Sequence, residues 1–468
     1  MILVVALFYT NRSRLRLPPG PRRIPFLGNI QQLPATYQER AFAEWGKRFG
    51  EVVYAQFFNT PVIILSRAET AHALLSKRGA KYSGRPRFTY MNEIVGWNNA
   101  PPPVDAVALL ARDALTSYEP LQRQEIQKLL RDLIRDPGDA LAHVKRYTAA
   151  LMLGIGYGYS PSSLDDAYIR TSEQAIRLVL GGGGPGSASS TSFRSYVLLM
   201  NYVRHLPAWM PGMEFKRRGI RARGMRVKRD VVRCGTATPC VATALLEEAM
   251  KGGTSVKPTR KNIDGIGDLI PILAGFLLAM ILHPEVLQKV QTEIDSVPRD
   301  RTALPYLEAV LTEVYRYLTE SDEYAGYDMP KGSIVIGNIW AMSRDEDLYP
   351  DPDRFDPERF LNICAETAET RDPRNFVFGF GRRICPGRVL ADSSIFHAAS
   401  NLAAVFDIRQ ASGPDGKPIP VAVVFTSGTV RTVYMHTLPK IEQEGGSHSN
   451  GRSHRQSTVM SEHKNDSP

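Results

Sequence analysis

One cysteine, Cys385, lies among glycines and arginines in residues 376–387 (FVFGFGRRICPG). The apolar spacing that follows predicts an amphipathic helix that begins near Arg388 and runs as far as Phe406. A cysteine just before a helix faces the positive end of the helix dipole, which favours the thiolate over the thiol. Cys385 therefore has the setting of a nucleophile, a redox thiol or a metal ligand.

The neighbours of Cys385 help to separate these three chemistries. No second cysteine or histidine accompanies it at the spacing of a zinc site, a redox disulfide or a covalent haem attachment. Gly379, Gly381 and Gly387 allow the backbone to turn tightly and a flat ligand to approach with no Cβ in the way. One thiolate beside such a platform points to haem iron as its partner. A buried structural cysteine before a helix is the alternative.

The pattern Phe378-x-x-Gly381-x-Arg383-x-Cys385-x-Gly387 resembles the haem-binding signature of cytochrome P-450 monooxygenases at every defined position. The resemblance implies a mainly α fold with a small β region and haem b as cofactor. It implies that Cys385 is the axial ligand of the haem iron and that Phe378, Gly381, Arg383 and Gly387 bind the cofactor. The implied reaction inserts one oxygen atom from O₂ into a lipophilic organic substrate.

Two upstream segments agree with this resemblance in order and spacing. Glu313 and Arg316 lie on one predicted helix, and Arg359 lies in a Pro-Glu-Arg-Phe segment at residues 357–360. As an isolated motif, a Glu/Arg pair at this spacing is usually solvated and carries little information. In the family, the equivalent residues form a buried charge network that braces the haem loop. The resemblance therefore assigns that role to Glu313, Arg316 and Arg359.

Three segments depart from the family pattern. Residues 97–117 lack the expected Trp-Arg-x-x-Arg helix, and only residues 317–323 separate Arg316 from the next recognisable turn. In the distal helix, Asp268 occupies the place of the expected threonine, and Pro271 follows within one turn, where it would kink or break a helix. Asp268 is the candidate catalytic residue, because its carboxylate could order a water.

These departures keep two alternative functions open. One is a haem-binding pseudoenzyme that does not turn over, and the other is a haem-free helical scaffold. The intact cysteine segment favours the enzyme.

Local patterns predict the elements around these residues. Two β-rich runs at 52–57 and 62–65 predict a hairpin, and residues 66–69 (SRAE) predict a capping box for a helix that reaches about Arg78. Helical spacing covers residues 121–134 and 284–295. Another pair of runs, at 421–425 and 430–435, predicts a second hairpin.

The ends of the chain differ from its body in composition. Residues 1–17 combine an apolar run with arginines and are interpreted as a short membrane-anchor remnant. Residues 18–440 form the predicted haem-thiolate catalytic domain. Residues 441–468 are rich in Gly, Ser, His and charged residues, which predicts a disordered polar tail.

Composition bounds the compartment and the partners. The chain has 468 residues, four cysteines and a formal net charge of +10, which excludes a disulfide framework and fits a reducing compartment. It has no nucleic-acid module and no flavin or NADPH fingerprint, so electrons would come from a separate NADPH-cytochrome reductase. Five arginines near the cysteine segment could meet an acidic reductase face; they are Arg371, Arg374, Arg382, Arg383 and Arg388. For Arg371 and Arg374, a plain solvated surface is the alternative.

The resemblance is closest to the fungal membrane-associated branch, which is linked to secondary metabolism and detoxification. It implies a small lipophilic substrate and a location on the cytoplasmic face of the endoplasmic reticulum membrane.

Overall fold

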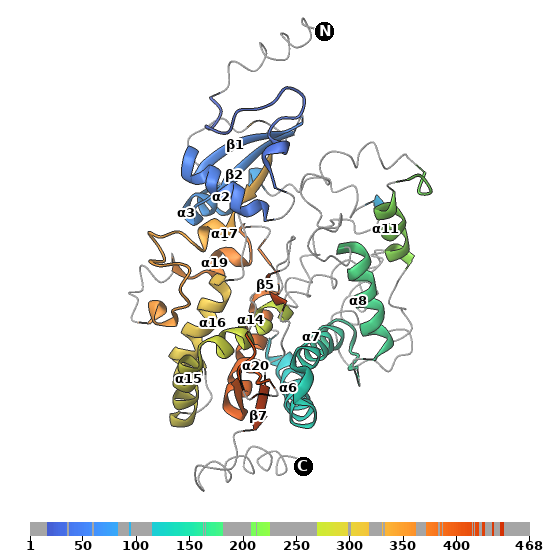
Figure 1. Ribbon diagram of the computed structural model, residues 1–468, viewed down its shortest axis with the longest axis vertical. Helices are drawn as coiled ribbons and strands as arrows, with labels where there is room; N and C mark the ends of the chain where they lie inside the picture. The colour runs from blue at the N-terminus through green and yellow to red at the C-terminus, as the bar shows by residue number, and fades with distance from the viewer. Residues whose placement is uncertain are drawn as a thin grey trace, which may run out of the picture.

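The computed structural model is mainly helical, with three small β-sheets among the residues that it describes, and the expected fold class is confirmed. The residues that the structure describes are 16–34, 37–58, 60–82, 93–94, 115–161, 163, 165–180, 207–211, 213–224, 269–297, 301–317, 330, 333–361, 371–381, 384–385, 387–413, 415, 417–420, 424–425, 433–434 and 440–443. A three-stranded sheet lies at one end of the molecule, and the longest helices lie toward the other (Figure 1).

The three-stranded sheet combines segments from both halves of the chain. β1 (Val52–Phe57) and β2 (Thr60–Leu65) pair antiparallel, which confirms the first predicted hairpin. β3 (Ile334–Gly337) pairs parallel with β2. β2 is buried along nearly its whole length, and α2 (Gln38–Phe49) packs against the hairpin.

The predicted capping box is wrong. The helix after β2 is α3 (Ala68–Ala71), whose N-cap is Arg67 and makes no capping hydrogen bond through its side chain. Ser66 instead extends the hairpin, because its backbone N–H donates to the carbonyl oxygen of Glu51 at 3.0 Å. Its side chain also lies against α2, where a Cβ on Gly46 would come within 2.4 Å of Ser66 Oγ. The helix continues as a π-helical turn, η2 (His72–Ser76).

In the described part of the chain, four long helices pack against a fifth that is apolar along its whole length, and a sixth, α6 (Leu115–Arg135), packs against two of the four. The central helix is α14 (Leu269–Leu282), which packs against α7, α15, α16 and α20. These four are α7 (Ala140–Tyr157), α15 (Pro284–Ser296), α16 (Pro305–Tyr317) and α20 (Arg388–Val405). A helix that is apolar on all sides must be buried, and α14 accordingly supplies much of the core. The helices predicted at 121–134 and 284–295 are confirmed.

Pro271 does not break α14 within the described residues. The helix is continuous from Leu269 to Leu282 in the described residues, and Pro271 lies within it. Among the described residues, no single helix is long and apolar enough to cross a membrane. α14 and α15 together reach that length, but the chain bends by 106° between them.

Buried polar contacts attach α20 to the neighbouring helices. Gln122 Nε2 on α6 donates to Ser394 Oγ at 2.8 Å, and Tyr147 Oη on α7 donates to the carbonyl oxygen of Ser394 at 3.2 Å. Three partners on α6, α7 and α20 are thus fixed at one point of the core. The position of α20 matters because Cys385 lies just before it.

The C-terminal strands correct two sequence-based boundaries. α20 ends at Val405, and Phe406 begins the strand β4 (Phe406–Arg409) instead of closing the helix. β4 pairs antiparallel with β7 (Lys440–Gln443), so the first three residues of the predicted polar tail belong to a strand. β5 (Val424–Phe425) pairs with β6 (Val433–Tyr434), which places a short ladder inside the second predicted hairpin.

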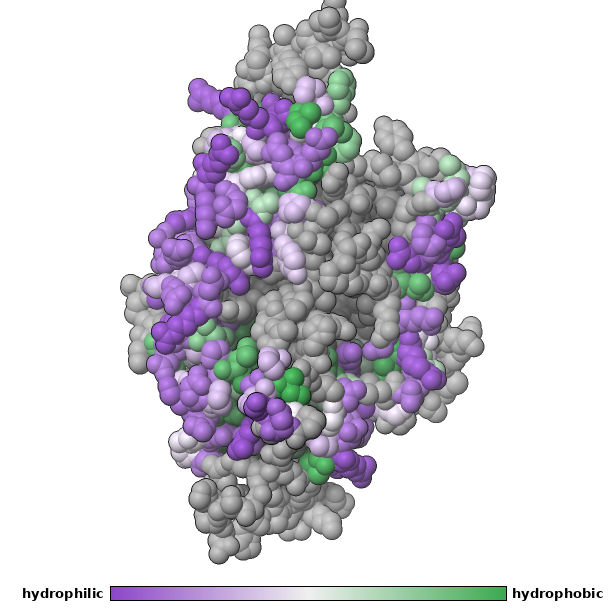
Figure 2. Space-filling view, in the orientation of Figure 1, coloured by the Kyte–Doolittle hydropathy of each residue, from purple (hydrophilic) through white to green (hydrophobic). Residues whose placement is uncertain are grey.

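The remaining helical elements are shorter or lie outside the central bundle. They are η1 (Ile30–Gln32), α4 (Gly79–Tyr82), η5 (Pro137–Asp139), α8 (Ala167–Leu180), α11 (Glu214–Gly224), η7 (Arg301–Ala303), α17 (Ile339–Met342), η8 (Pro357–Phe360) and α19 (Arg374–Val377). Hydrophilic side chains predominate over much of the described surface on the face shown in Figure 2.

Candidate functional site

The segment between α19 and α20 folds back on itself at Cys385. The backbone N–H of Cys385 donates to the carbonyl oxygen of Phe378 at 2.8 Å, and the N–H of Ile384 donates to that of Gly381 at 3.2 Å. Gly379 and Gly381 both adopt left-handed backbone conformations, with φ of 79° and 52°. Because side chains disfavour that region, these two glycines are what permits the return of the chain.

Gly381 also allows the loop to approach another part of the backbone. A Cβ at this position would lie 2.3 Å from the carbonyl oxygen of Leu75 in η2. The loop is therefore held against the N-terminal part of the chain, next to the sheet. Gly381 therefore adopts a left-handed backbone conformation and also leaves room for the backbone of Leu75, and a residue with a Cβ would be unfavourable on both counts.

Cys385 is half-buried and forms no disulfide bond among the described residues. Gly387, two residues later, is the N-cap of the 18-residue helix α20, and the N–H of Arg388 donates to the carbonyl oxygen of Cys385 at 3.3 Å. Cys385 thus lies just before the N-terminus of a long helix, at the positive end of its dipole, as the sequence predicted. This setting stabilises a thiolate.

The second predicted constellation is partly assembled. Arg359 in η8 places Nε 3.5 Å from Oε2 of Glu313 on α16, and the Glu313 side chain is fully buried. Oε1 of Glu313 accepts from the backbone N–H of Asp356 at 3.2 Å. Arg359 also donates to backbone carbonyl oxygens, including that of Pro350 at 2.7 Å. The pair therefore ties α16 to the chain around η8.

Three predicted site residues are only partly covered by the structure or not covered. Arg316 belongs to α16, but its side chain lies outside the described residues. Asp268 and Arg383 also lie outside the described residues. The structure therefore brings Glu313 and Arg359 together, and it shows Phe378, Gly381, Cys385 and Gly387 in one loop.

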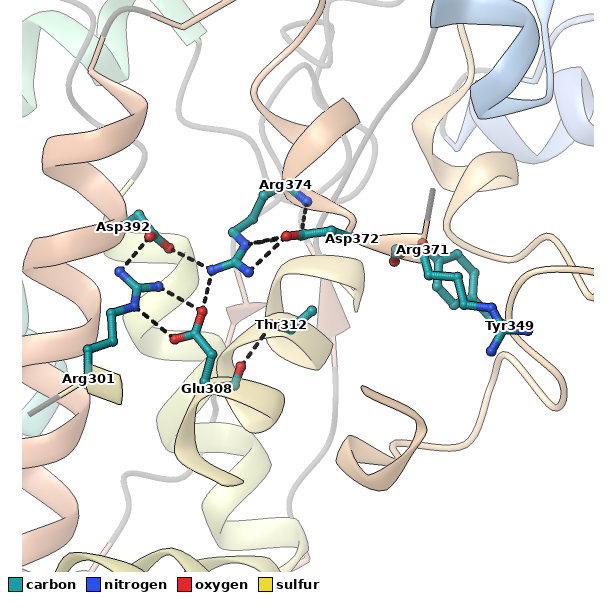
Figure 3. Close-up of polar contacts among 8 residues, drawn as sticks. All are labelled: Arg301, Glu308, Thr312, Tyr349, Arg371, Asp372, Arg374 and Asp392. Carbon is teal, nitrogen blue, oxygen red and sulfur yellow. Dashed lines mark hydrogen bonds and ion pairs between the residues drawn. The ribbon is translucent and has the colours of Figure 1, made fainter. Parts of the chain in front are cut away.

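Sequence reasoning missed a second charged network, which we call the Glu308 cluster (Figure 3). Its members come from η7, α16, α20 and the segment around α19; they are Arg301, Glu308, Asp372, Arg374 and Asp392. Arg301 grips Glu308 through two hydrogen bonds of 3.0 and 2.9 Å. Arg374 Nη1 lies 2.5 Å from the same Glu308 carboxylate, and Arg301 Nη1 lies 2.6 Å from Asp392.

Arg374 does not face outward toward an acidic reductase, as the sequence analysis considered. Its guanidinium points into the Glu308 cluster and makes hydrogen bonds with Asp372 at 3.0 and 2.8 Å (Figure 3). Burial alone would lower the pKa of Arg374, but these carboxylates raise it above its ordinary value. The only sequence signal for this role was the occurrence of acidic residues between apolar positions of α16 and α20.

The residues of the cysteine loop fit a haem group. Cys385 offers one soft thiolate ligand, and a Cβ at Gly387 would lie 4.0 Å from the sulfur, in ordinary van der Waals contact with it. Among the described residues, no group of three or more His, Cys, Asp or Glu side chains is placed to hold a metal ion. A single thiolate is a ligand that could hold haem iron.

Comparisons with known proteins agree with this geometry. The cytochrome P450 family model matches residues 18–102 and 271–431. A cytochrome P450 monooxygenase 136 from Postia placenta is 37% identical, over 92% of this chain and 89% of the relative. Cytochrome P450 monooxygenase COX2 from Coprinopsis cinerea is 31% identical, over 87% of this chain and 86% of the relative.

A relative with a more specific name shows similar coverage. The tryptamine 4-monooxygenase of Psilocybe cyanescens is 31% identical, over 92% of this chain and 94% of the relative. The family-model match and the near-full-length relatives confirm the resemblance read from the cysteine segment. This chain belongs to the cytochrome P450 family and is a monooxygenase by type.

Proposed function

We propose that this chain is a haem-thiolate monooxygenase that inserts one oxygen atom from O₂ into a small lipophilic organic substrate. The observation that carries the proposal is the Cys385 loop, in which a half-buried cysteine enters the N-terminus of α20. When bound, haem b supplies the oxygen-activating chemistry. The protein supplies the ligand and the surroundings that keep it ionised and in place.

Several residues of the chain have separate roles in holding the cofactor and its loop. Cys385 would hold the iron through Sγ, and the carbonyl oxygen of Phe378 fixes the backbone of that residue. Glu313 and Arg359 hold α16 against the chain that leads toward the loop. By resemblance, Arg383 would contact the cofactor. Asp268, which stands where the family has a threonine, would order a water through its carboxylate.

Electrons are proposed to come from NADPH through a separate reductase. Arg388 is exposed at the start of α20, next to the cysteine loop, and its charge suits an acidic partner surface. The net charge of +10 agrees with this proposal.

A membrane surface is the proposed location, on the cytoplasmic face of the endoplasmic reticulum. The apolar residues 1–9 and the following arginines support this proposal. So do Ile24 and Phe26, whose side chains are exposed beside β1, with Phe26 74% exposed. Fungal secondary metabolism or detoxification is the proposed context, which the fungal relatives support.

Reduced-carbonyl difference spectroscopy on the full-length haem-loaded protein tests this function. We expect a thiolate-type Soret band that Cys385→Ala removes. A protein that stays colourless after hemin supplementation would be a haem-free scaffold, and the proposal would fail.

Turnover separates an enzyme from a haem-binding pseudoenzyme. With added reductase and NADPH, a panel of lipophilic substrates is expected to give products carrying one oxygen atom from ¹⁸O₂. A thiolate-type band without any oxygenated product would assign the chain to the pseudoenzyme class. The Asp268→Asn variant is expected to lower product yield while leaving the band unchanged.

A further inference from the structure

The Glu308 cluster joins the two ends of the Cys385 loop. Arg374 precedes Cys385 in the chain, and Asp392 follows it on α20. The two side chains meet, with Arg374 Nη1 3.5 Å from Asp392 Oδ1. The loop is therefore closed at its base by a direct charge contact between its flanks.

Both flanks are also attached to a third element. Oε1 of Glu308, on α16, lies 2.5 Å from Arg374 Nη1 and 2.9 Å from Arg301 Nη2. Arg301 in turn places Nη1 2.6 Å from Oδ2 of Asp392. Each flank of the loop is thus connected to α16, directly at Arg374 and through Arg301 at Asp392. Figure 3 shows these side chains converging from separate elements.

The Glu308 cluster is connected to Cys385 through the short helix α19. Arg374 begins α19, and Phe378, the residue that caps the end of α19, accepts the hydrogen bond from the Cys385 N–H. Tyr315 on α16 packs its ring against that of Phe378, with 5.7 Å between ring centroids. A shift of Arg374 would therefore move the carbonyl group that holds Cys385.

We propose that the Glu308 cluster is a clamp that fixes the position of the Cys385 sulfur, with Arg374 and Asp392 as positioning residues. This inference rests on the proposed function, because the sulfur it positions is the iron ligand. Site geometry depends on supporting residues that lock the ligand, and loosening them changes the ligand more than the fold.

Another ion cluster in the same chain provides a matched control. Arg146 on α7 places Nη1 2.9 Å from Glu125 Oε2 and Nε 2.9 Å from Asp132 Oδ2, both on α6. Its side chain is more deeply buried than that of Arg374. None of these three residues belongs to the loop or its flanks. Arg146→Gln therefore removes a comparable buried charge without releasing Cys385.

The experiment compares Arg374→Gln, Asp392→Asn and Arg146→Gln in the full-length haem-loaded protein. The readouts are the ratio of thiol-type to thiolate-type reduced-carbonyl bands and the thermal unfolding midpoint. For Arg374→Gln we expect the ratio to rise at least about tenfold, because the substitution removes charge-assisted hydrogen bonds to Glu308 and Asp372 and one such bond is worth about that factor. Asp392→Asn should change the ratio in the same direction, and Arg374→Lys should recover part of the wild-type value.

Arg146→Gln should lower the unfolding midpoint and leave the band ratio unchanged. If Arg374→Gln does not fold with haem, Asp392→Asn decides the question alone. An unchanged ratio in the variants that bind haem would overturn the clamp and leave the proposed function intact. Absence of the thiolate-type band from the wild-type protein would overturn the proposed function and the clamp together.

Discussion

The backbone nitrogen of Cys385 donates a 2.8 Å hydrogen bond to the carbonyl oxygen of Phe378. This contact closes a tight loop whose intervening residues include two left-handed glycines, Gly379 and Gly381. The loop exists because the glycines permit it and because its flanks are held by other elements. The backbone conformation at Gly379 and Gly381 therefore decides where Cys385 lies, and the reactivity of its thiol depends on that position.

Gly381→Ala should destabilise the protein and empty the haem site. The substitution adds left-handed strain of about 1–2 kcal/mol. It also places a Cβ 2.3 Å from the carbonyl oxygen of Leu75, a clash with backbone that costs about 1–3 kcal/mol more. Urea unfolding and the haem-to-protein absorbance ratio measure the two effects.

Gly50→Ala is a control for positive-φ strain without a clash, in a backbone region that glycine alone adopts readily. Gly50 has φ of 106° at the C-cap of α2, and a Cβ there would meet nothing within 4 Å. We expect Gly50→Ala to lose stability but to keep its haem. Equal losses of stability and haem in the two variants would contradict the clash with Leu75.

Glu313→Gln should cost about 3 kcal/mol of unfolding free energy, because it leaves the Arg359 guanidinium largely buried without its carboxylate. The backbone carbonyl oxygens around Arg359 remain as acceptors, which places the cost at the lower end of the range for broken buried pairs. Chemical unfolding of the two proteins under the same conditions gives the difference.

An exposed pair in the same region provides the comparison. Lys289 on α15 pairs with Glu358 in η8, and more than half of each side chain is exposed. Solvent screens such pairs, so Lys289→Gln should leave the unfolding free energy unchanged within error. A similar loss in both variants would mean that the burial of Glu313 is not what makes its pair matter.

His397 on α20 should make stability depend on pH. Burial lowers the pKa of its imidazole below the ordinary value of 6.5, and the carboxylate of Glu119 offsets this only in part. Below about pH 6.5 the unfolded chain binds a proton at this position before the folded chain does. The unfolding free energy should therefore fall as the pH decreases through this range, and this contribution disappears above it.

His397→Gln isolates that contribution. The variant should lose less stability than the wild type between about pH 6.5 and pH 5, because one protonation has been removed from the balance. Urea unfolding at several pH values measures both slopes. Parallel slopes for the two proteins would show that His397 titrates alike in the folded and unfolded chains.

Local patterns were sufficient for the elements that depend on nearby residues. The first hairpin, α6, α15 and the start of α20 were predicted because periodic apolar spacing reflects which face of a strand or helix is buried. The loop around Cys385 was predictable for a similar reason, since its glycines and its position before a helix are local properties. The capping box failed because the backbone of Ser66 extends the hairpin and bonds to Glu51, which lies just before β1.

Partners far apart in the sequence could not be predicted in this way. Arg374 was assigned to the surface, and the structure turns it toward Glu308, because nothing in its neighbouring residues specifies a carboxylate on another helix. The pairing of β3 with β2 is another example, since register between distant strands depends on how the intervening chain packs.

The sequence by itself determined the family, the thiolate setting of Cys385 and the main helices, because each follows from residue types at short spacing. Only the tertiary structure decided which charges support the loop. The Glu308 cluster forms because the packing of α14, α16 and α20 brings carboxylates and guanidinium groups within hydrogen-bond distance in a partly buried place. A buried charge without a partner of opposite sign is costly, so the packing of the helices decides which carboxylates and guanidinium groups are paired.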